Sequence, residues 1–336
     1  MILHPVTIKD GASTEECLGV GNTPLVAMPR SATGTGRWYA KLESHNEMGS
    51  MKLRSAYKIL TEAQLRVGST VIESTSGNMG VALAYVGRQL GLRVILVTDP
   101  KLSPSHGIEM RQLGATTIQV TTIDKTGGYL LTRLKKVETL CEEHPDWFWV
   151  NQYSNPLNPL AFESIAIEIV RDLNKNVHLH SNTTLWYFAS VSTGGSLSGS
   201  ARALRRLCRR LPIKELRIVA VDAEGSAIFG RPARLRNLNG IGSSLNQPPN
   251  LQRSLIDDVV IVSDAEAFAA CYGLRHADFY VGGSSGAVWA AIHKKAHHFV
   301  AQDIVIALFP DGGRMYEETI YSPAWLRQKG FPELTP

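Results

Sequence analysis

The sequence has no long hydrophobic run, few aromatic residues and only four cysteines, and each shortage excludes a class of protein. No apolar stretch approaches the roughly 18 residues that cross a bilayer, so a membrane span is not expected. Aromatic residues make up 7% of the chain and are not interleaved with the basic stretch 202–214, which argues against nucleic-acid binding. Residues 1–16 combine a short apolar start with early acidic residues, so a signal peptide is not expected.

The cysteines, Cys17, Cys141, Cys208 and Cys271, are scattered and show none of the spacings of a metal site. We therefore expect no metal and reduced thiols, which are typical of cytoplasmic proteins. The net charge is only +5, so composition gives no reason to expect a nucleic acid or a membrane surface as partner. The 336 residues are ample for two domains.

What the chain does have is a repeated alternation of apolar and amphipathic segments. Apolar runs predict buried strands at 70–75, 93–99, 117–121, 147–152, 183–190 and 216–223. Segments of helical period follow at 78–91, 108–114, 129–143 and 160–173, with another that ends near residue 210. This alternation predicts an α/β fold with mostly parallel sheets, in two domains with a cleft between them.

Three loops at predicted strand ends carry groups that suit a ligand, since ligands bind at the carboxyl ends of strands in such sheets. The loop STSGNMG (74–80) can cradle a carboxylate, although it is equally consistent with an ordinary helix cap. The loop SVSTGGSLSG (190–199) brings two glycines to a helix start, and it suits one phosphate group because no lysine follows the glycines. The third, VGGSSGAVWAA (281–291), is a hydroxyl-bearing turn that opens another helix.

Lys52 follows a Gly-Ser pair in GSMKLRSA (49–56), at the predicted start of a helix. On its own it would be interpreted as a solvated surface charge. The order of lysine, asparagine-containing loop, glycine loop and serine turn resembles the cysteine-synthase superfamily, the fold-type-II enzymes that use pyridoxal 5′-phosphate (PLP). The resemblance extends from GNTPLV (21–26) to FPDGGRMY (309–316).

The resemblance implies a tryptophan synthase β-like fold of two three-layer α/β/α domains, with mostly parallel sheets and the site in the cleft between them. It implies a small, mobile domain at 48–155 that binds the substrate carboxylate. A large domain formed by 1–47 and 156–336 is implied to bind the cofactor phosphate. A cytoplasmic homodimer is implied as well.

The resemblance also assigns roles to the motif residues. Lys52 matches the catalytic lysine that forms a Schiff base with PLP, Asn78 the residue that bonds the phenolic oxygen of the ring, and Ser284 the hydroxyl that faces the pyridine nitrogen. The residues matched to the binding of the cofactor phosphate are Ser192, Thr193, Gly194, Gly195 and Ser196. The residues assigned to the substrate are Thr75, Ser76, Met79, Arg133, Gln152 and Tyr153.

A serine at position 284 bears on the chemistry. Because a hydroxyl cannot keep the pyridine nitrogen protonated as a carboxylate would, the ring delocalises a Cα carbanion less, and loss of a β-leaving group competes well against transamination. The expected reaction is β-elimination to an aminoacrylate, followed by addition of a nucleophile. For Lys52, a partly dry site with a cationic neighbour favours the unprotonated, nucleophilic amine.

Three positions depart from the usual cysteine-synthase pattern. Tyr153 stands where phenylalanine is usual, Ser192 where glycine is usual, and Met79 where threonine is usual. Each change alters polarity or bulk near the substrate. Arg133, on a predicted helix, can clamp a phosphate leaving group with its guanidinium. Without the resemblance, Arg133 would be interpreted as a solvated helix charge.

Together with the segments 219–230, 240–244 and 310–326, these departures resemble one branch of the superfamily, which serves siderophore biosynthesis of the staphyloferrin B type. The resemblance implies that O-phospho-L-serine loses phosphate and that the amine of L-glutamate adds to give N-(2-amino-2-carboxyethyl)-L-glutamate, on a route to 2,3-diaminopropionate. The turn GIGSS (240–244) either touches the second substrate or is only a turn.

Other interpretations remain open. They are a sulfhydrylase acting on O-acetylserine or O-phosphoserine, a diaminopropionate synthase that uses another amine, and an inactive relative that binds the cofactor or a partner. Intact Lys52, Asn78 and Ser284 argue against the last. A cystathionine synthase with regulatory modules is not expected.

Overall fold

The computed structural model describes residues 14–29 and 35–334. The strands are β1 (Leu25–Ala27), β2 (Arg37–Leu42), β3 (Thr70–Ser74), β4 (Arg93–Thr98), β5 (Thr116–Gln119), β6 (Phe148–Trp149), β7 (Thr184–Ser190), β8 (Glu215–Ala223), β9 (Asp258–Val262) and β10 (Ile304–Phe309). The α-helices are α1 (Thr14–Cys17), α2 (Lys52–Glu62), α3 (Asn78–Gln89), α4 (Pro104–Gln112), α5 (Leu130–Glu143), α6 (Leu157–Ala161), α7 (Glu163–Asn176), α8 (Gly195–Leu207), α9 (Asp264–His276), α10 (Gly283–Lys295) and α11 (Pro323–Gln328). Short 3-10 turns include η1 (Glu43–His45) and η5 (Arg314–Tyr316).

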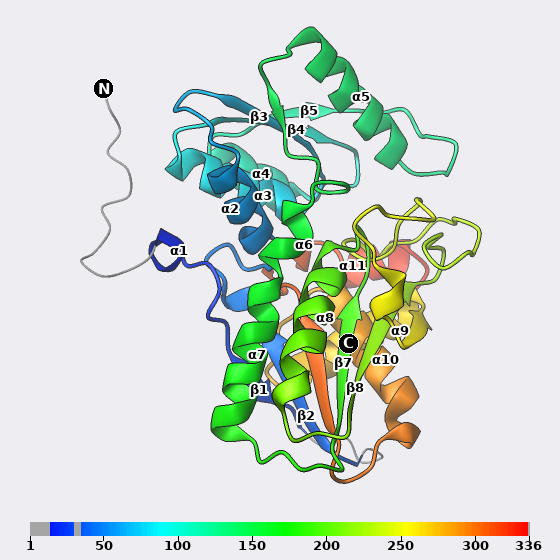
Figure 1. Cartoon of the computed structure of the whole chain (residues 1–336). Coiled ribbons are helices and arrows are strands. Elements are labelled where there is room, and N and C mark those ends of the chain that lie inside the picture. Colours follow the sequence, from blue (N-terminus) through cyan, green and yellow to red (C-terminus); the bar gives the residue numbers. More distant parts are fainter. Residues whose placement is uncertain (1–13, 30–34, 335–336) are drawn as a thin grey trace.

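The strands form two sheets that occupy separate parts of the molecule (Figure 1). The larger has the order β1-β2-β10-β7-β8-β9, and the smaller has the order β5-β4-β3-β6. Every pairing between these strands is parallel except that of β1 with β2. The predicted α/β fold with mostly parallel sheets is therefore confirmed. The domain limits 48–155, 1–47 and 156–336 stay a prediction.

The larger sheet is covered on both faces because its strands bury alternate side chains in opposite directions. Along β7, Tyr187 packs into an apolar cluster with α7 and α8, whereas its neighbour Phe188 packs into the cluster formed by α9 and α10. In the smaller sheet, Val71 of β3 packs with α2 and α3, and Ile72 packs against Val137 of α5. Each sheet is thus the middle layer of three.

Some element limits differ from those predicted from the sequence. Helix α4 begins at Pro104 rather than near residue 108, because the Ser103 side chain accepts the N–H of His106 and proline is well suited to the first helical position. Strand β6 has two residues rather than six, and the chain turns at Asn151, whose φ is +49°. The helix predicted at 160–173 is divided between α6 and α7.

The carboxyl ends of both sheets face one cavity, because residues that follow β3, β4 and β7 all line it. In Figure 1, the irregular segment between β8 and β9, in yellow, lies at the level where the two parts of the molecule meet. Within the described part of the chain, no helix has the length and apolar character needed to cross a membrane.

Candidate active site

A cavity of about 200 Å³ lies between the loops of the two sheets. The small-sheet side contributes the loops after β3 and β4 and the segment 126–130, and the large-sheet side contributes the end of β7 and the segment 234–244. The predicted site residues that line the cavity are Lys52, Thr75, Ser76, Asn78, Met79, Arg133, Gln152, Tyr153, Ser192 and Thr193. Gly194, Gly195 and Ser196 continue the loop beyond Thr193.

Ser284 lies close to this wall without being part of it. Its hydroxyl donates to the main-chain oxygen of Asn239, which does line the cavity, over 3.3 Å. A Cβ at Gly240 would stand 3.2 Å from the Ser284 Oγ. The glycine therefore lets the chain pass directly over the hydroxyl that the sequence assigns to the pyridine nitrogen.

Lys52 is the first residue of α2, and the chain before it is fixed to the end of the large sheet. The N–H of Met51 donates to the oxygen of Pro310 over 2.8 Å, and the N–H of Gly312 donates to the oxygen of Gly49 over 3.1 Å. These bonds place Asp311 next to the start of the helix. The lysine thus faces a carboxylate that lies more than 250 positions further along the chain.

Burial determines the protonation of this site. It lowers the pKa of Lys52, against the opposing charges of Asp311 and Glu73. It raises the pKa of Asp311 to about 6 and that of Glu73 to about 7, although hydrogen bonds to both carboxylates act in the other direction. Among the described residues, the buried Oδ1 of Asp311 has no hydrogen-bond partner. An amine that loses its proton easily therefore stands beside carboxyl groups that accept one near neutral pH.

Asn78 is held by a chain of hydrogen bonds. Its Nδ2 donates to Asp311 Oδ2 over 2.6 Å, and its Oδ1 lies 3.0 Å from Nε2 of His106. Burial lowers the pKa of His106 to about 4, so the ring is neutral. Ser103 Oγ accepts the N–H of His106 and lies 2.7 Å from Nδ1, to which it donates. The ring proton then lies on Nε2 and fixes which end of the Asn78 amide is the oxygen.

Because this arrangement fixes the Asn78 amide, it also determines where the two N–H groups of its nitrogen point. An amide nitrogen has two donors, and the structure uses one of them on Asp311. The hydroxyl of Tyr316 also donates to the same carboxylate oxygen. The Asn78 amide also acts on the Tyr316 hydroxyl as a hydrogen-bond donor, and it lines the cavity, where it can reach a ligand.

The glycine loop forms a bare helix start. Gly194 has φ +85°, and a Cβ there would lie 2.6 Å from Leu251, so no other residue fits without rearrangement. A Cβ at Gly195 would lie 2.6 Å from Nδ2 of Asn158. No side chain caps α8 at Gly194, and the Thr193 hydroxyl accepts the N–H of Gly195 at 3.4 Å. The first turn therefore has main-chain donors and a helix dipole suited to an anion.

Arg133 is a buried residue rather than the solvated helix charge that its sequence context alone indicates. It is 8% exposed, its Nε lies 3.1 Å from Asp99 Oδ2, and its Nη1 donates to Ser76 Oγ over 3.0 Å. Two residues on the loops after β3 and β4 thus fix the orientation of the guanidinium.

Tyr153 lines the same cavity, and burial raises the pKa of its hydroxyl.

The Ser192 hydroxyl has a partner inside the protein. It donates to the oxygen of Gly242 over 2.9 Å, and the N–H of Gly242 donates to the oxygen of Val191 over 2.7 Å. The turn 240–244 is therefore docked on the end of β7. This contact fixes the orientation of the Ser192 side chain in the cavity wall.

Several residues of the site were not predicted from the sequence. They are Asp311, Glu73, Asp99, His106 and the cations Lys101 and Arg236, of which the last two and Asp99 line the cavity. A signal was present for Asp99 and Asp311, because both come directly after buried apolar strands, where ligand sites form. Nothing near His106 or Arg236 in the sequence indicates a role.

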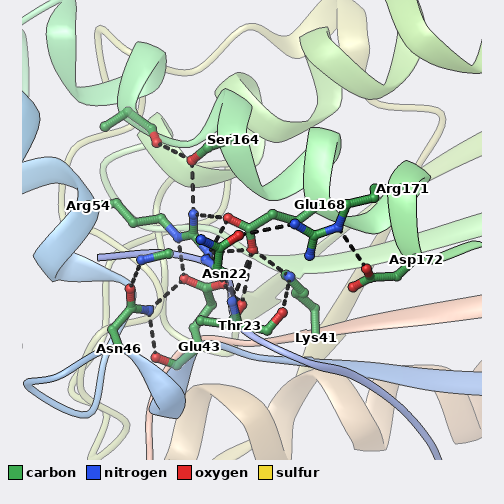
Figure 2. Close-up of polar contacts among 12 residues, drawn as sticks. Asn22, Thr23, Lys41, Glu43, Asn46, Arg54, Ser164, Glu168, Arg171 and Asp172 are labelled. Carbon is green, nitrogen blue, oxygen red and sulfur yellow. Dashed lines mark hydrogen bonds and ion pairs between the residues drawn. The ribbon is translucent and has the colours of Figure 1, made fainter. Parts of the chain in front are cut away.

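A buried ion cluster, formed by Lys41, Glu43, Arg54 and Glu168, supports the helix that carries Lys52 (Figure 2). Arg54 lies between the two carboxylates, at 2.7 Å from each, and Lys41 Nζ lies 2.6 Å from Glu168. The four side chains are at most 8% exposed. The cluster joins β2, η1, α2 and α7, so it fixes the start of α2 against the large sheet.

Comparison with known proteins agrees with this arrangement. The family described as pyridoxal-phosphate dependent enzyme matches residues 17–311. The chain is 40% identical over 317 residues to an N-(2-amino-2-carboxyethyl)-L-glutamate synthase of Cupriavidus metallidurans, and 39% identical over 314 residues to one of Ralstonia nicotianae. Each alignment covers 91% of this chain and 89% of the relative. The crystal structure of an O-acetylserine dependent cystathionine beta-synthase from Helicobacter pylori superposes with a TM-score of 0.80 at 31% identity, covering 90% of this chain and 97% of the other. The chain therefore belongs to the pyridoxal-phosphate dependent enzymes, and PLP is its cofactor.

Proposed function

We propose that this enzyme joins O-phospho-L-serine to L-glutamate in a β-replacement that gives N-(2-amino-2-carboxyethyl)-L-glutamate and phosphate. The bond between Cβ and the ester oxygen of phosphoserine breaks, and phosphate leaves with the electron pair. A bond then forms between Cβ and the amine nitrogen of glutamate, which releases a proton. The names of the two relatives at about 40% identity support this product.

The observation that carries the proposal is the charge of the cavity wall. Besides Lys52, four basic side chains line it, namely Lys101, Arg133, Arg234 and Arg236, and the single acidic side chain among the described residues of the wall is Asp99. A phosphorylated amino acid and a dicarboxylic amino acid together bring several negative charges, which such a wall favours. An acetyl ester and sulfide bring fewer negative charges to the cavity.

The residues of the site fit PLP. The start of α8 after Gly194 offers main-chain donors to its phosphate, and the Asn78 amide can donate to its phenolic oxygen. The amine of Lys52, whose pKa is lowered by burial, is suited to hold its aldehyde carbon. When bound, PLP supplies the electron sink that lets Cα lose a proton and Cβ lose its leaving group.

The other residues act on the substrates. Lys52, when released as a free amine, moves the proton at Cα, because burial keeps its pKa below the usual value for lysine. Thr75 and Ser76, at a helix start, hold the substrate carboxylate. Arg133 binds the departing phosphate with its guanidinium. Its Nη1 donates to Ser76, and its Nε lies 3.1 Å from Asp99 Oδ2 but forms no hydrogen bond within the described part of the chain.

The test is to mix the purified enzyme with O-phospho-L-serine and a panel of nucleophiles, and to identify the products by mass. We expect the glutamate adduct and an equal amount of phosphate. Cysteine formed from sulfide, with no glutamate adduct, would instead make the chain a sulfhydrylase. Borohydride reduction and peptide mapping are expected to place the cofactor on Lys52, and Lys52→Ala is the matched control, which should bind no cofactor covalently.

We also propose that the product serves a route to 2,3-diaminopropionate in siderophore biosynthesis, in the cytoplasm. The predicted small domain at 48–155 and a homodimer belong to the same proposal. Light scattering that gives twice the chain mass would support the dimer, and the mass of a single chain would exclude it.

A further inference from the structure

Three basic side chains with no role in the steps above line the cavity, and one of them, Arg234, is exposed. The other two lie on opposite sides of it. Lys101 lies in the turn after β4, on the side of the small sheet, and Arg236 lies in the segment 234–244, on the side of the large sheet. Main-chain oxygens hold the Arg236 guanidinium: Nε donates to Ile241 at 3.3 Å and Nη1 to Gly225 at 3.4 Å. Its Nη2 has no partner in residues 14–29 and 35–334.

Two other cations of the cavity wall each have a carboxylate beside them. Lys52 faces Asp311, and Arg133 pairs with Asp99. Within the same described ranges, neither Lys101 nor Arg236 forms an ion pair with a carboxylate. Carboxylates act on these cations without pairing directly, Asp222 and Asp264 on Arg236 and Asp99 and Asp264 on Lys101. Both side chains therefore remain able to pair directly with an anion in the cavity.

The two cations also act on each other. Burial lowers the pKa of Lys101, and the nearby Arg236 lowers it further. Two like charges that face one cavity are unfavourable when it holds only water, and an anion between them removes that cost. Tyr153, which is assigned to the substrate, lines the same cavity as Arg236 and Lys101, so this anion would lie on the substrate side of the cavity.

We propose that Arg236, with Lys101 opposite it, binds the side-chain carboxylate of the second substrate, a dicarboxylic amino acid. This inference rests on the proposed function. The donor phosphate is assigned to Arg133, which is held by the loops after β3 and β4. A guanidinium held in one orientation is suited to a carboxylate, which takes two parallel N–H bonds, and a neutral side chain cannot replace that charge.

The test compares L-glutamate with L-glutamine, which has the same size and no side-chain charge. Arg236→Gln is expected to lower kcat/KM for L-glutamate about 10- to 100-fold and to leave that for L-glutamine nearly unchanged. Lys101→Met is expected to act in the same direction with a smaller effect. The matched control is Arg231→Gln, an exposed arginine near the same segment that does not line the cavity, and it should behave as the wild type.

A binding measurement makes the test independent of turnover. Calorimetry with glutarate, a dicarboxylate that cannot react, is expected to show binding to the wild-type holoenzyme and about 10-fold or greater loss in Arg236→Gln. Butyrate, with one carboxylate, serves as the comparison ligand. Equal losses for L-glutamate and L-glutamine, or unchanged glutarate affinity, would overturn the assignment of Arg236.

The failure of this inference is distinguishable from that of the proposed function. Phosphate release from O-phospho-L-serine without a second substrate tests the donor alone, and we expect Arg236→Gln to slow this release much less than it lowers kcat/KM for L-glutamate. Wild-type enzyme that releases no phosphate would refute the proposed donor. Normal release together with an unchanged preference of Arg236→Gln for L-glutamate would refute the carboxylate subsite alone.

Discussion

Replacing Glu168 by glutamine is expected to destabilise the enzyme strongly, although the residue lies outside the cavity. Its Oε1 accepts from Arg54 at 2.7 Å and from the N–H of Asn22 at 3.0 Å. Its Oε2 accepts from Lys41 at 2.6 Å, from Arg54 at 2.9 Å and from the N–H of Thr23 at 3.2 Å. Glutamine keeps the size of the side chain, but it removes the charge and turns one acceptor into a donor.

The loss of stability caused by Glu168→Gln can be estimated in two ways. Removing one partner from a buried ion pair costs about 3–5 kcal/mol, because the other charges stay buried without compensation. Independently, Arg54 and Lys41 lower the pKa of Glu168 from 4.5 to about 2 in spite of its burial, which corresponds to about 3 kcal/mol of stability. We therefore expect the free energy of unfolding to fall by about 3–5 kcal/mol at neutral pH.

The pH dependence has a definite sign. A carboxyl whose pKa is lowered by folding contributes fully above its unfolded pKa of 4.5, and the contribution is lost as the pH falls through its folded pKa of about 2. The difference between the wild type and Glu168→Gln is thus expected to shrink from about 3 kcal/mol at pH 6 to about 1.4 kcal/mol at pH 3. Urea unfolding of the PLP-saturated enzyme at several pH values measures both quantities.

Glu163 provides the matched control. It lies on the same helix, α7, but pairs with Arg202, whose side chain is 34% exposed. Such a pair contributes about 1 kcal/mol or less, so Glu163→Gln should have a small effect. If Glu168→Gln cost no more than Glu163→Gln, or if its cost did not depend on pH, the reasoning about the buried ion cluster would be refuted.

Three further predictions concern the cavity. Arg133→Ala is expected to slow phosphate release from O-phospho-L-serine about 10- to 100-fold and to slow the reaction of O-acetylserine less, which rapid-mixing measurements with each donor can compare; equal losses would assign Arg133 to structure. Tyr153→Phe combined with Ser192→Gly is expected to raise activity with O-acetylserine relative to O-phospho-L-serine, and an unchanged ratio under single-turnover conditions would show that the two hydroxyls do not select the donor. His106→Ala is expected to weaken PLP binding in a cofactor titration because the Asn78 amide is no longer fixed, whereas His106→Gln keeps a donor and should bind PLP more tightly than His106→Ala; equal affinities would argue against the positioning role.

Most of the fold could be predicted because burial patterns are local. The continuous apolar run at 183–190 predicts a strand buried on both faces, and β7 is such a strand. The ends of helices and strands were less predictable where a single contact decides them. The Ser103 side chain caps α4, so this helix begins earlier than the apolar pattern suggests. Strand β6 is short because the turn at Asn151 ends it, and its apolar sequence does not show that turn.

The residues of the site likewise fall into those that the sequence could predict and those that it could not. The loops around Asn78 and Thr193 could be predicted because a strand end, a glycine and a helix start are adjacent in the sequence. The partners of these loops could not, because they come together only in the folded chain. Asp311 lies 233 positions from Asn78, and Glu168 lies 127 positions from Lys41. Pairings over such separations leave no periodic or compositional signal.

The anchoring of α2 has a mechanical consequence. Met51 is bonded to Pro310, Arg54 to Glu168, and the Ser55 hydroxyl to Asn158, so the first turn of the helix is joined to the large-sheet side of the molecule. If the smaller sheet tilted, it would rotate about an axis close to this turn. Atoms near that axis would move least. The distance between the Lys52 amine and the glycine loop would stay nearly constant. The loops after β3 and β4 would move further. Lys52, which we propose to hold the cofactor, would thus lie near the axis of such a movement, and the loops after β3 and β4 would lie further from it.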